Sequence, residues 1–213
     1  MIATEKYGLM DDVHPEVAQR FGAEALNPVL DMDCGEGRFI NAAQTYDLHA
    51  IALDQSETML AAVSTPRTNG DARRLPFHDG CCGGVAALWM LYHLPVPRDA
   101  IAEAYRVLRS GGIFIACAPS RYHDPELSEV LPSSQLATFD AENGPELVGE
   151  LFNDLVVIRW DDPLVHLPAQ QALKLYLKGR GLSDAEIAEA DGIASLPPTL
   201  TKRGALMTGR KAN

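Results

Sequence analysis

Residues 28–39 of the chain read PVLDMDCGEGRF, an apolar run that passes into an acidic turn with two glycines. Residues 28–32 have the length and composition of a buried strand, and residues 38–46 have helix-forming composition. Gly35 and Gly37 lie between them, where glycine permits a tight turn and a close approach of a ligand to the backbone. A strand, a glycine turn and a helix in this order open a βα unit of the nucleotide-binding type.

The same alternation continues on both sides of this turn. Before it, Val17 and Phe21 recur at helical spacing within a predicted helix at residues 14–26. After it, the predicted strands are 50–53, 65–69, 84–88 and 113–117, and the predicted helices are 56–63 and 97–109. Because parallel strands need crossover connections, the pattern predicts an α/β protein with a mostly parallel sheet and helices on both faces.

The second half of the chain is less regular. We expect an irregular or partly helical insertion at residues 119–140. A helix, a strand, a helix and a final strand are then predicted at residues 145–152, 155–160, 169–177 and 205–210. These late elements are placed to cover the open end of the sheet.

Composition narrows the range of partners and compartments. The chain has 18 Lys and Arg against 29 Asp and Glu, a formal net charge of -11, which disfavours nucleic acid. No run approaches the roughly 18 apolar residues of a membrane span, and the first residues do not resemble a signal peptide. The four cysteines form no disulfide or zinc pattern, so we expect free thiols, no metal site and a cytoplasmic protein.

Two other ligand sites compete for the glycine turn. A dinucleotide site requires G-x-G-x-x-G, and the segment Asp33 to Phe39 does not fit that pattern. A P-loop requires Gly-Lys-Ser or Gly-Lys-Thr, and the sequence contains neither. Both alternatives are therefore disfavoured.

Acidic residues follow several predicted strands, at the sheet edge where α/β proteins bind ligands. Asp54 ends the second strand and is placed to accept hydrogen bonds from two ribose hydroxyls, and Asp71 follows the third strand and could read an adenine amino group. An Asp after a strand is often only a helix cap, so each position also has a purely structural explanation.

Taken together, these stretches resemble the motifs of class I S-adenosylmethionine-dependent methyltransferases. Residues 29–39 are similar to the first motif, V-L-D-x-G-C-G-x-G, and residues 106–112 to R-V-L-K-P-G-G. Residues 52–60, 70–77 and 91–94 resemble the second motif, the third motif and the L-H-H-L stretch of the small-molecule branch called methyltransferase type 11. The resemblance covers about residues 28–118 and implies a Rossmann-like, seven-stranded sheet with an antiparallel last strand.

The resemblance also implies a cofactor, S-adenosyl-L-methionine, and the residues that bind it. The methionine part would contact Asp31 and the backbone of residues 34–37, which includes Cys34, and the ribose would contact Asp54. The adenosine would contact Gln55, Met59, Asp71 and Ala72, and the sulfonium would lie near Leu88 and Trp89. This cofactor carries a sulfonium and an ammonium but no phosphate, so acidic residues suit it.

Two positions depart from the family pattern. Asp33 replaces the first glycine of the first motif, close to the expected methionyl ammonium, where it either contributes an ion pair or weakens the site. Cys82 and Gly83 stand where the family usually has Phe-Asp. Trp89 could stack on the adenine, face the cation, or simply pack in the core or against an insertion.

The methyl acceptor is expected beyond strand 84–88. His93 and Tyr92 are the candidate catalytic residues there, with His123 and His166 as more distant candidates. Apolar side chains expected to line the acceptor pocket are Tyr7, Phe139, Leu164, Leu173, Tyr176 and Leu177.

The sequence thus predicts one methyltransferase domain over residues 1–213. It divides into an N-terminal helical segment (1–27), a cofactor-binding core (28–118) and two insertions that are expected to form a lid over the substrate (119–140 and 163–200). The predicted function is methyl transfer to an oxygen, nitrogen or carbon of a small-molecule metabolite. The alternative is a methyltransferase-like binding or regulatory protein without catalysis. Neither nucleic acid nor membrane is expected as a partner, and the protein is expected to be a monomer or homodimer.

Overall fold

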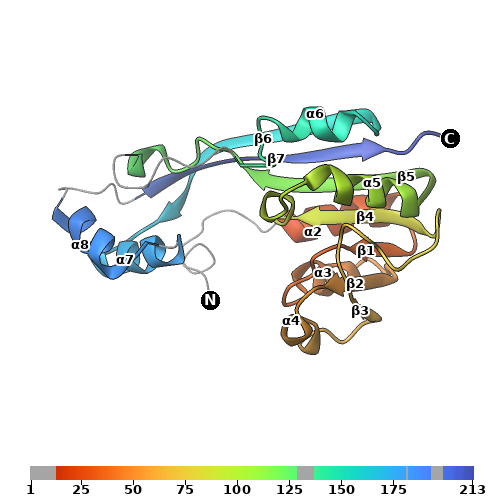
Figure 1. The fold of residues 1–213 in the computed structure, drawn as a ribbon, viewed down its shortest axis with the longest axis horizontal. Coiled ribbons are helices and arrows are strands. Elements are labelled where there is room, and N and C mark those ends of the chain that lie inside the picture. Colours follow the sequence, from red (N-terminus) through yellow and green to blue (C-terminus); the bar gives the residue numbers. More distant parts are fainter. Residues whose placement is uncertain (1–12, 129–136, 181, 193–198) are drawn as a thin grey trace.

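A seven-stranded sheet forms the centre of the protein, in the order β3-β2-β1-β4-β5-β7-β6 (Figure 1). The structure, a computed structural model, describes residues 13–128, 137–180, 182–192 and 199–213. The strands are β1 (Val29–Asp31), β2 (Ala50–Asp54), β3 (Arg67–Asn69), β4 (Cys82–Leu88), β5 (Leu108–Pro119), β6 (Asn153–His166) and β7 (Thr199–Arg210). Strands β1 to β5 are parallel, whereas β7 runs antiparallel to both β5 and β6. The predicted α/β fold with an antiparallel last strand is confirmed.

Helices α2 (Val13–Ala23), α3 (Arg38–Gln44), α4 (Glu57–Ala61), α5 (Pro97–Val107) and α6 (Gly144–Gly149) cover the two faces of this sheet. Two more helices, α7 (Gln170–Gly179) and α8 (Asp184–Gly192), lie beyond it, and there are 3-10 turns at η1 (Leu91–His93) and η2 (Pro125–Leu127). Side chains of α2, α3 and α4 pack into one apolar core, and those of α5 and α6 into another. The two cores lie on opposite faces of the central strands.

Strand β4 shows how the sequence builds these two cores. All seven of its residues are buried, and successive side chains alternate between the faces. Val85 and Ala87 join the core beneath α5, whereas Ala86 and Leu88 join the core beneath α2 and α3. At Gly84 a Cβ would lie 2.9 Å from the ring of Phe21, so the missing side chain lets α2 pack closely against the strand.

Beyond the carboxyl end of β5, strands β6 and β7 continue as a two-stranded ribbon. The last pair between β5 and β7 is Pro119 with Gly204, while β6 and β7 pair on to His166 and Thr199. Figure 1 shows this ribbon carrying α7 and α8 away from the sheet. We call this part of the structure (residues 161–180, 182–192 and 199–203) the distal arm. Its apolar core is separate from the other two and includes Leu127 of η2.

Several boundaries differ from the sequence prediction. The strands predicted at 155–160 and 205–210 are longer, and β5 already begins at Leu108, so it includes Gly111 and Gly112, which lie between the predicted helix and the predicted strand. Helix α8 was not predicted, and α6 ends at Gly149, earlier than expected. Parts of the predicted segments 1–27, 119–140 and 163–200 lie outside the described residues.

Within the described part of the chain, no helix is long and apolar enough to span a membrane.

Candidate functional site

The glycine turn between β1 and α3 is held against the end of β2. The Cys34 amide donates to the Leu53 carbonyl at 2.9 Å, and the Gly37 amide donates to the Cys34 carbonyl at 2.8 Å. Gly35 and Gly37 have φ values of 48° and 84°, in the left-handed region that favours glycine. A Cβ built on Gly35 meets no described atom within 4 Å, so one side of the turn is open.

Asp54 joins this turn to the start of α4. Its side chain is buried at the end of β2. One carboxylate oxygen accepts the Gly35 amide at 2.8 Å, and the other accepts the Ser56 amide at 2.7 Å. Because a carboxylate has about four acceptor positions, Asp54 can still accept hydrogen bonds from hydroxyls of a ligand.

Three carboxyl groups converge beside the turn. Burial raises the pKa of Asp31 to about 8, and the charges of Asp33 and Asp54 raise it further, against a lowering hydrogen bond from the Asp33 backbone. Partial burial also raises the pKa of Asp33 to about 6, with contributions from the charge of Asp54 and a side-chain hydrogen bond to it. Carboxyl groups that hinder each other's ionisation create a site that a cation would stabilise.

The third motif, residues 70–77, lies beside Asp54, and its acidic residue, Asp71, is already paired with Arg73. The Gly70 amide donates to the Asp54 carbonyl at 3.1 Å, which joins the end of β3 to the end of β2. The carboxylate of Asp71 accepts from Arg73 Nε at 3.0 Å and from Arg73 Nη2 at 2.7 Å. These hydrogen bonds to Arg73 lower the pKa of Asp71. Ala72 is buried in the core beneath α5.

Gln55 and Met59 lie on the exposed side of the same edge. The Gln55 carbonyl accepts a hydrogen bond from the Asn69 side chain at 2.9 Å, and its own side chain is exposed. Met59 belongs to α4 and is 40% exposed, although it is a large apolar side chain. Ser56 caps α4 by accepting a hydrogen bond from the Met59 amide. An exposed methionine next to Asp54 suits an apolar ligand surface.

Leu88 and Trp89 mark the carboxyl end of β4. Trp89 has a φ of 60° and donates its amide to the Cys117 carbonyl at 3.1 Å. Its ring meets the ring of Trp160, from β6, edge to face with centroids 6.0 Å apart. Trp89 and Trp160 both pack against the core beneath α2 and α3.

Tyr92 and His93 follow in η1, and their rings lie 4.4 Å apart. Burial raises the pKa of Tyr92 to about 12, and the neighbouring Cys117 thiol adds to this. The hydroxyl therefore stays protonated near neutral pH and acts in hydrogen bonds, not as a base. His93 is exposed to solvent.

Most of the apolar side chains predicted to line an acceptor pocket are core residues. Phe139 is fully buried in the core beneath α5. Leu173, Tyr176 and Leu177 are buried in the core of the distal arm. Their amphipathic pattern reflects packing in these cores. The prediction that they line an acceptor pocket is therefore wrong for these four side chains. Tyr7 lies outside the described residues, and Leu164 is partly exposed.

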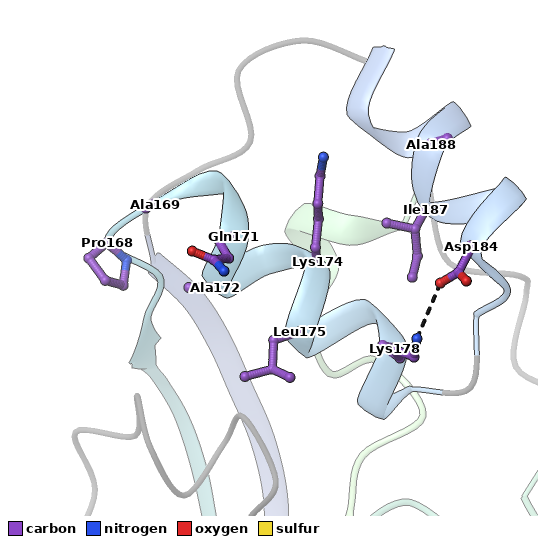
Figure 2. Close-up of a pocket in the computed structure, with 10 residues that line it drawn as sticks. All are labelled: Pro168, Ala169, Gln171, Ala172, Lys174, Leu175, Lys178, Asp184, Ile187 and Ala188. Atoms are coloured by element: carbon purple, nitrogen blue, oxygen red, sulfur yellow. Dashed lines mark hydrogen bonds and ion pairs between the residues drawn. The ribbon is translucent and has the colours of Figure 1, made fainter.

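The distal arm has a groove of its own between α7 and α8, with a volume of about 670 Å³ (Figure 2). It is lined by Pro168, Ala169, Gln171, Ala172, Lys174, Leu175, Lys178, Asp184, Ile187 and Ala188. The ion pair between Lys178 and Asp184, at 3.3 Å, links its two helices. None of the predicted cofactor or catalytic residues lines this groove, so it is separate from the site at the sheet edge.

The residues at the sheet edge fit S-adenosylmethionine. Its positive charge is compatible with the carboxyl groups of Asp31, Asp33 and Asp54 beside the turn. The open side of Gly35 leaves room for a ligand against the backbone. Among the described residues, no group of three or more His, Cys, Asp or Glu side chains is placed to hold a metal ion.

Sequence reasoning missed three side chains that contact predicted site residues. Arg73 takes both oxygens of Asp71, Trp160 contacts Trp89, and Arg180 contacts His123. Arg73 lies two residues from its partner and could have been considered from spacing alone. The other two contacts depend on the register of β6 and the position of α7, which no local pattern reveals.

Comparison with known proteins agrees with the motif assignments. Residues 30–116 match the family model of the methyltransferase domain. An uncharacterised chloroplastic methyltransferase of Arabidopsis thaliana is 34% identical over 123 residues, which span 50% of this chain and 35% of the relative. The ubiquinone/menaquinone biosynthesis C-methyltransferase of Dinoroseobacter shibae is 32% identical over 139 residues, 58% of this chain and 52% of the relative. The chain thus spans about half the length, or less, of these relatives.

The fold is shared more widely than the sequence. A crystal structure of a SAM-dependent methyltransferase from Archaeoglobus fulgidus superposes with a TM-score of 0.62 at 16% identity, covering 93% of this chain and 94% of the other. That likeness extends over both the sheet and its late strands. Over residues 30–116, the chain therefore matches the methyltransferase domain family.

Proposed function

We propose that the protein transfers a methyl group from S-adenosylmethionine to a small-molecule acceptor. The observation that carries this proposal is the convergence of Asp31, Asp33 and Asp54 on the open glycine turn. This arrangement offers negative charge and exposed backbone, which suit a cationic ligand that has no phosphate. The match of residues 30–116 to the methyltransferase domain supports the same ligand.

The residues have distinct roles in this proposal. Asp31, Asp33 and the backbone of residues 34–37 hold the methionine part, and Asp54 accepts the ribose hydroxyls. Gln55, Met59, Asp71 and Ala72 surround the adenosine, and Leu88 and Trp89 lie towards the sulfonium. Because Asp71 is already paired with Arg73, its carboxylate contributes to adenine recognition only if it shares its oxygens with that guanidinium.

The chain's contribution to the reaction is mainly alignment and exclusion of water. The bound cofactor supplies a methyl carbon that is already activated by the sulfonium, so an acceptor aligned with it needs little further activation. Tyr92 is protonated and can fix the acceptor by a hydrogen bond. His93 is the candidate to accept a proton from an acceptor that must lose one.

The proposal includes expectations about partners and compartment. The net charge of -11 supports a small acceptor over a nucleic acid. All four cysteines are free thiols, which supports a reducing compartment such as the cytoplasm. A monomer or homodimer is expected, and sedimentation velocity would measure which form is present.

Calorimetric titration with S-adenosylhomocysteine tests the proposal. We expect binding to the wild-type protein and at least about 100-fold weaker binding to Asp54→Ala, which loses charge-assisted hydrogen bonds to the ribose. Asp162→Ala, which removes an exposed carboxylate of β6, is the matched control and should bind normally. Melting temperatures of both variants show whether they remain folded. No detectable binding to the wild type would overturn the proposal.

The same protein separates an enzyme from a binding protein without catalysis. Transfer of tritium from methyl-labelled S-adenosylmethionine into a set of phenols, amines and quinols reports turnover. Labelled product that disappears in Asp54→Ala supports the enzyme. Tight cofactor binding without labelled product from any acceptor would favour the binding protein.

A further inference from the structure

Two adjacent cysteines bring their thiols together at the amino end of β4. Cys82 is the first residue of the strand, and Cys81 directly precedes it. Adjacent side chains of a regular strand point to opposite faces of the sheet. Here the two sulfur atoms lie 3.6 Å apart, and both residues pack with the core beneath α5. The pairing of β4 with β5 is irregular between Cys82 and Gly84, which accompanies this departure from strand geometry.

Hydrogen bonds hold the backbone on both sides of the cysteine pair. The Gly80 amide donates to a carbonyl of α5 at 3.0 Å, and the Gly83 amide donates to the Pro28 carbonyl at 2.8 Å. Cys82 is buried, whereas Cys81 is partly exposed. The two thiols are therefore anchored in the sheet and can be reached from solvent on the side of Cys81.

A disulfide between these two residues would strain the backbone. The Cα atoms of adjacent residues lie about 3.8 Å apart across a trans peptide bond, whereas disulfides usually join Cα atoms about 4.4–6.8 Å apart. Both cysteines are free thiols in the structure. Burial, and then the neighbouring Cys81 thiol, raise the pKa of Cys82, which favours its protonated form. The pair is therefore suited to remain a dithiol.

A single atom can bridge the two sulfurs without moving them. With bonds to sulfur of about 2.3 Å, as in zinc–thiolate sites, sulfurs 3.6 Å apart subtend an angle of about 100° at the bridging atom. A linear two-coordinate ion would need sulfurs about 4.6 Å apart at the same bond length. The observed separation thus fits a tetrahedral or pyramidal centre and does not fit a linear one.

The number of ligands selects between these two centres. A structural zinc ion requires four protein ligands. Across the part of the chain that the structure describes, no His, Cys, Asp or Glu side chain joins the two thiols to complete a group of three. A trivalent arsenic atom that carries one organic group is pyramidal, bonds readily to sulfur and needs only two further ligands. Cys81 and Cys82 offer that number at the required angle.

We propose that Cys81 and Cys82 form a dithiol site that binds trivalent organic arsenic compounds. In this reaction both As–OH bonds of R–As(OH)2 break and two As–S bonds form. The two thiol protons leave with the hydroxyl groups as two molecules of water, so no oxidant or reductant is needed. The partly exposed Cys81 reacts first, and Cys82, 3.6 Å away, then closes the ring.

This dithiol site is distinct from the candidate cofactor site. Leu88 and Trp89 mark the other end of β4, and a strand of seven residues at about 3.3 Å per residue separates the two sites by about 20 Å. The inference therefore does not depend on the proposed function. Occupation of the dithiol should leave the affinity for S-adenosylhomocysteine unchanged.

Mass spectrometry of the intact, reduced protein with phenylarsine oxide tests the inference. We expect one phenylarsenic group per chain, which withstands a large excess of glutathione, a monothiol, and is removed by 2,3-dimercaptopropanol, a dithiol. Cys81→Ala and Cys82→Ala should each lose the glutathione-resistant adduct. Cys117→Ala is the matched control, since it removes a buried thiol of β5, and it should keep the adduct.

Melting temperatures show whether the variants remain folded, and the partly exposed Cys81 decides the question if Cys82→Ala does not fold. No glutathione-resistant adduct in the wild type, or an adduct that persists in Cys81→Ala, would overturn the inference. Calorimetry with S-adenosylhomocysteine on the arsenic-loaded protein gives a second readout, because a loss of affinity relative to the free protein would place the arsenic at the other end of the strand. If the free protein does not bind S-adenosylhomocysteine, the proposed function fails, and the mass spectra still decide the role of the two thiols.

Discussion

At the scale of single residues, Asp33 is the position where this chain differs most clearly from the motif it resembles. A glycine there would leave two carboxyl groups near the turn, and Asp33 adds a third that shares a hydrogen bond with Asp54. Its identity was visible in the sequence, but its effect was not, because the interaction depends on how β1 and β2 end side by side. We expect attraction of a cation as the consequence.

Asp33→Asn tests this consequence. The substitution removes one charge at nearly constant size, so we expect about tenfold weaker binding of S-adenosylmethionine by calorimetry. The ligand-free variant should melt at the same or a higher temperature, because repulsion among the carboxyl groups falls. Glu36→Gln, at an exposed acid of the same turn, should change the affinity less than twofold. Tighter binding by Asp33→Asn would contradict an attractive role.

A substitution at Gly35 distinguishes the effect on folding from the effect on ligand binding. Alanine at a φ of 48° costs about 1 kcal/mol of folding free energy, and its Cβ meets no described atom. The same Cβ would stand on the open side of the turn. We expect Gly35→Ala to lose about 1 kcal/mol in urea denaturation and at least about tenfold in affinity for S-adenosylhomocysteine. Gly179→Ala, also without close neighbours, should leave that affinity unchanged, and normal binding by Gly35→Ala would place the ligand elsewhere.

At the scale of helices and strands, the sequence predicts the parallel half of the sheet well and the antiparallel half poorly. Strands β1, β2, β4 and β5 are buried on both faces and appear as apolar runs. Strand β6 is an edge strand with mostly exposed or partly exposed residues, including Asp161, Asp162 and Pro163, so its outer half carries no apolar alternation. It is a strand because β7 pairs with it, a long-range contact that no local pattern contains.

The stability of the distal arm depends on Asp124. Replacing it by alanine leaves the partly buried Lys202 without its ion pair, which costs about 3 kcal/mol. Because the arm has its own core, hydrogen exchange should accelerate in residues 170–180 and 199–203, while β1 and β4 keep their protection. Asp161→Ala removes a more exposed ion pair with Arg203 and should cost less than about 1 kcal/mol. Uniform acceleration across the sheet would show that the arm does not unfold separately.

At the scale of the whole molecule, the candidate site lies where the carboxyl ends of the parallel strands meet. Asp31, Asp54 and Asp71 could be predicted as site residues from the sequence, because parallel strands place their carboxyl ends together. Their hydrogen-bond partners could not be predicted: two backbone amides for Asp54, and Arg73 for Asp71. The distal arm depends on the long-range pairing of β6 with β7 and is the part of the molecule that the sequence predicted least.

The carboxyl groups at the sheet edge make both folding stability and cofactor binding depend on pH. The raised pKa values of Asp31 and Asp33 mean that the folded state keeps protons that the unfolded state loses above about pH 4. These groups therefore stabilise the ligand-free protein at low pH, and their contribution is lost as the pH rises through about 6 for Asp33 and about 8 for Asp31. His123 has the opposite effect: between its lowered pKa of about 4 and its usual pKa near 6.5, it makes the folded state more stable as the pH rises. The contribution of the carboxyl groups is therefore measured by comparing the wild type with variants that lack them.

A cationic cofactor favours the ionised carboxyl groups, so its binding should release protons. At pH 7 Asp31 is mostly protonated in the free protein and Asp33 is mostly ionised. We therefore expect release of about one proton for each S-adenosylmethionine bound, measured by calorimetry at pH 7 in buffers of different ionisation enthalpy. Asp31→Asn cannot release this proton, and its binding enthalpy should not depend on the buffer. The same buffer dependence in the wild type and in Asp31→Asn would show that the carboxyl groups at the turn do not face the cofactor's charge.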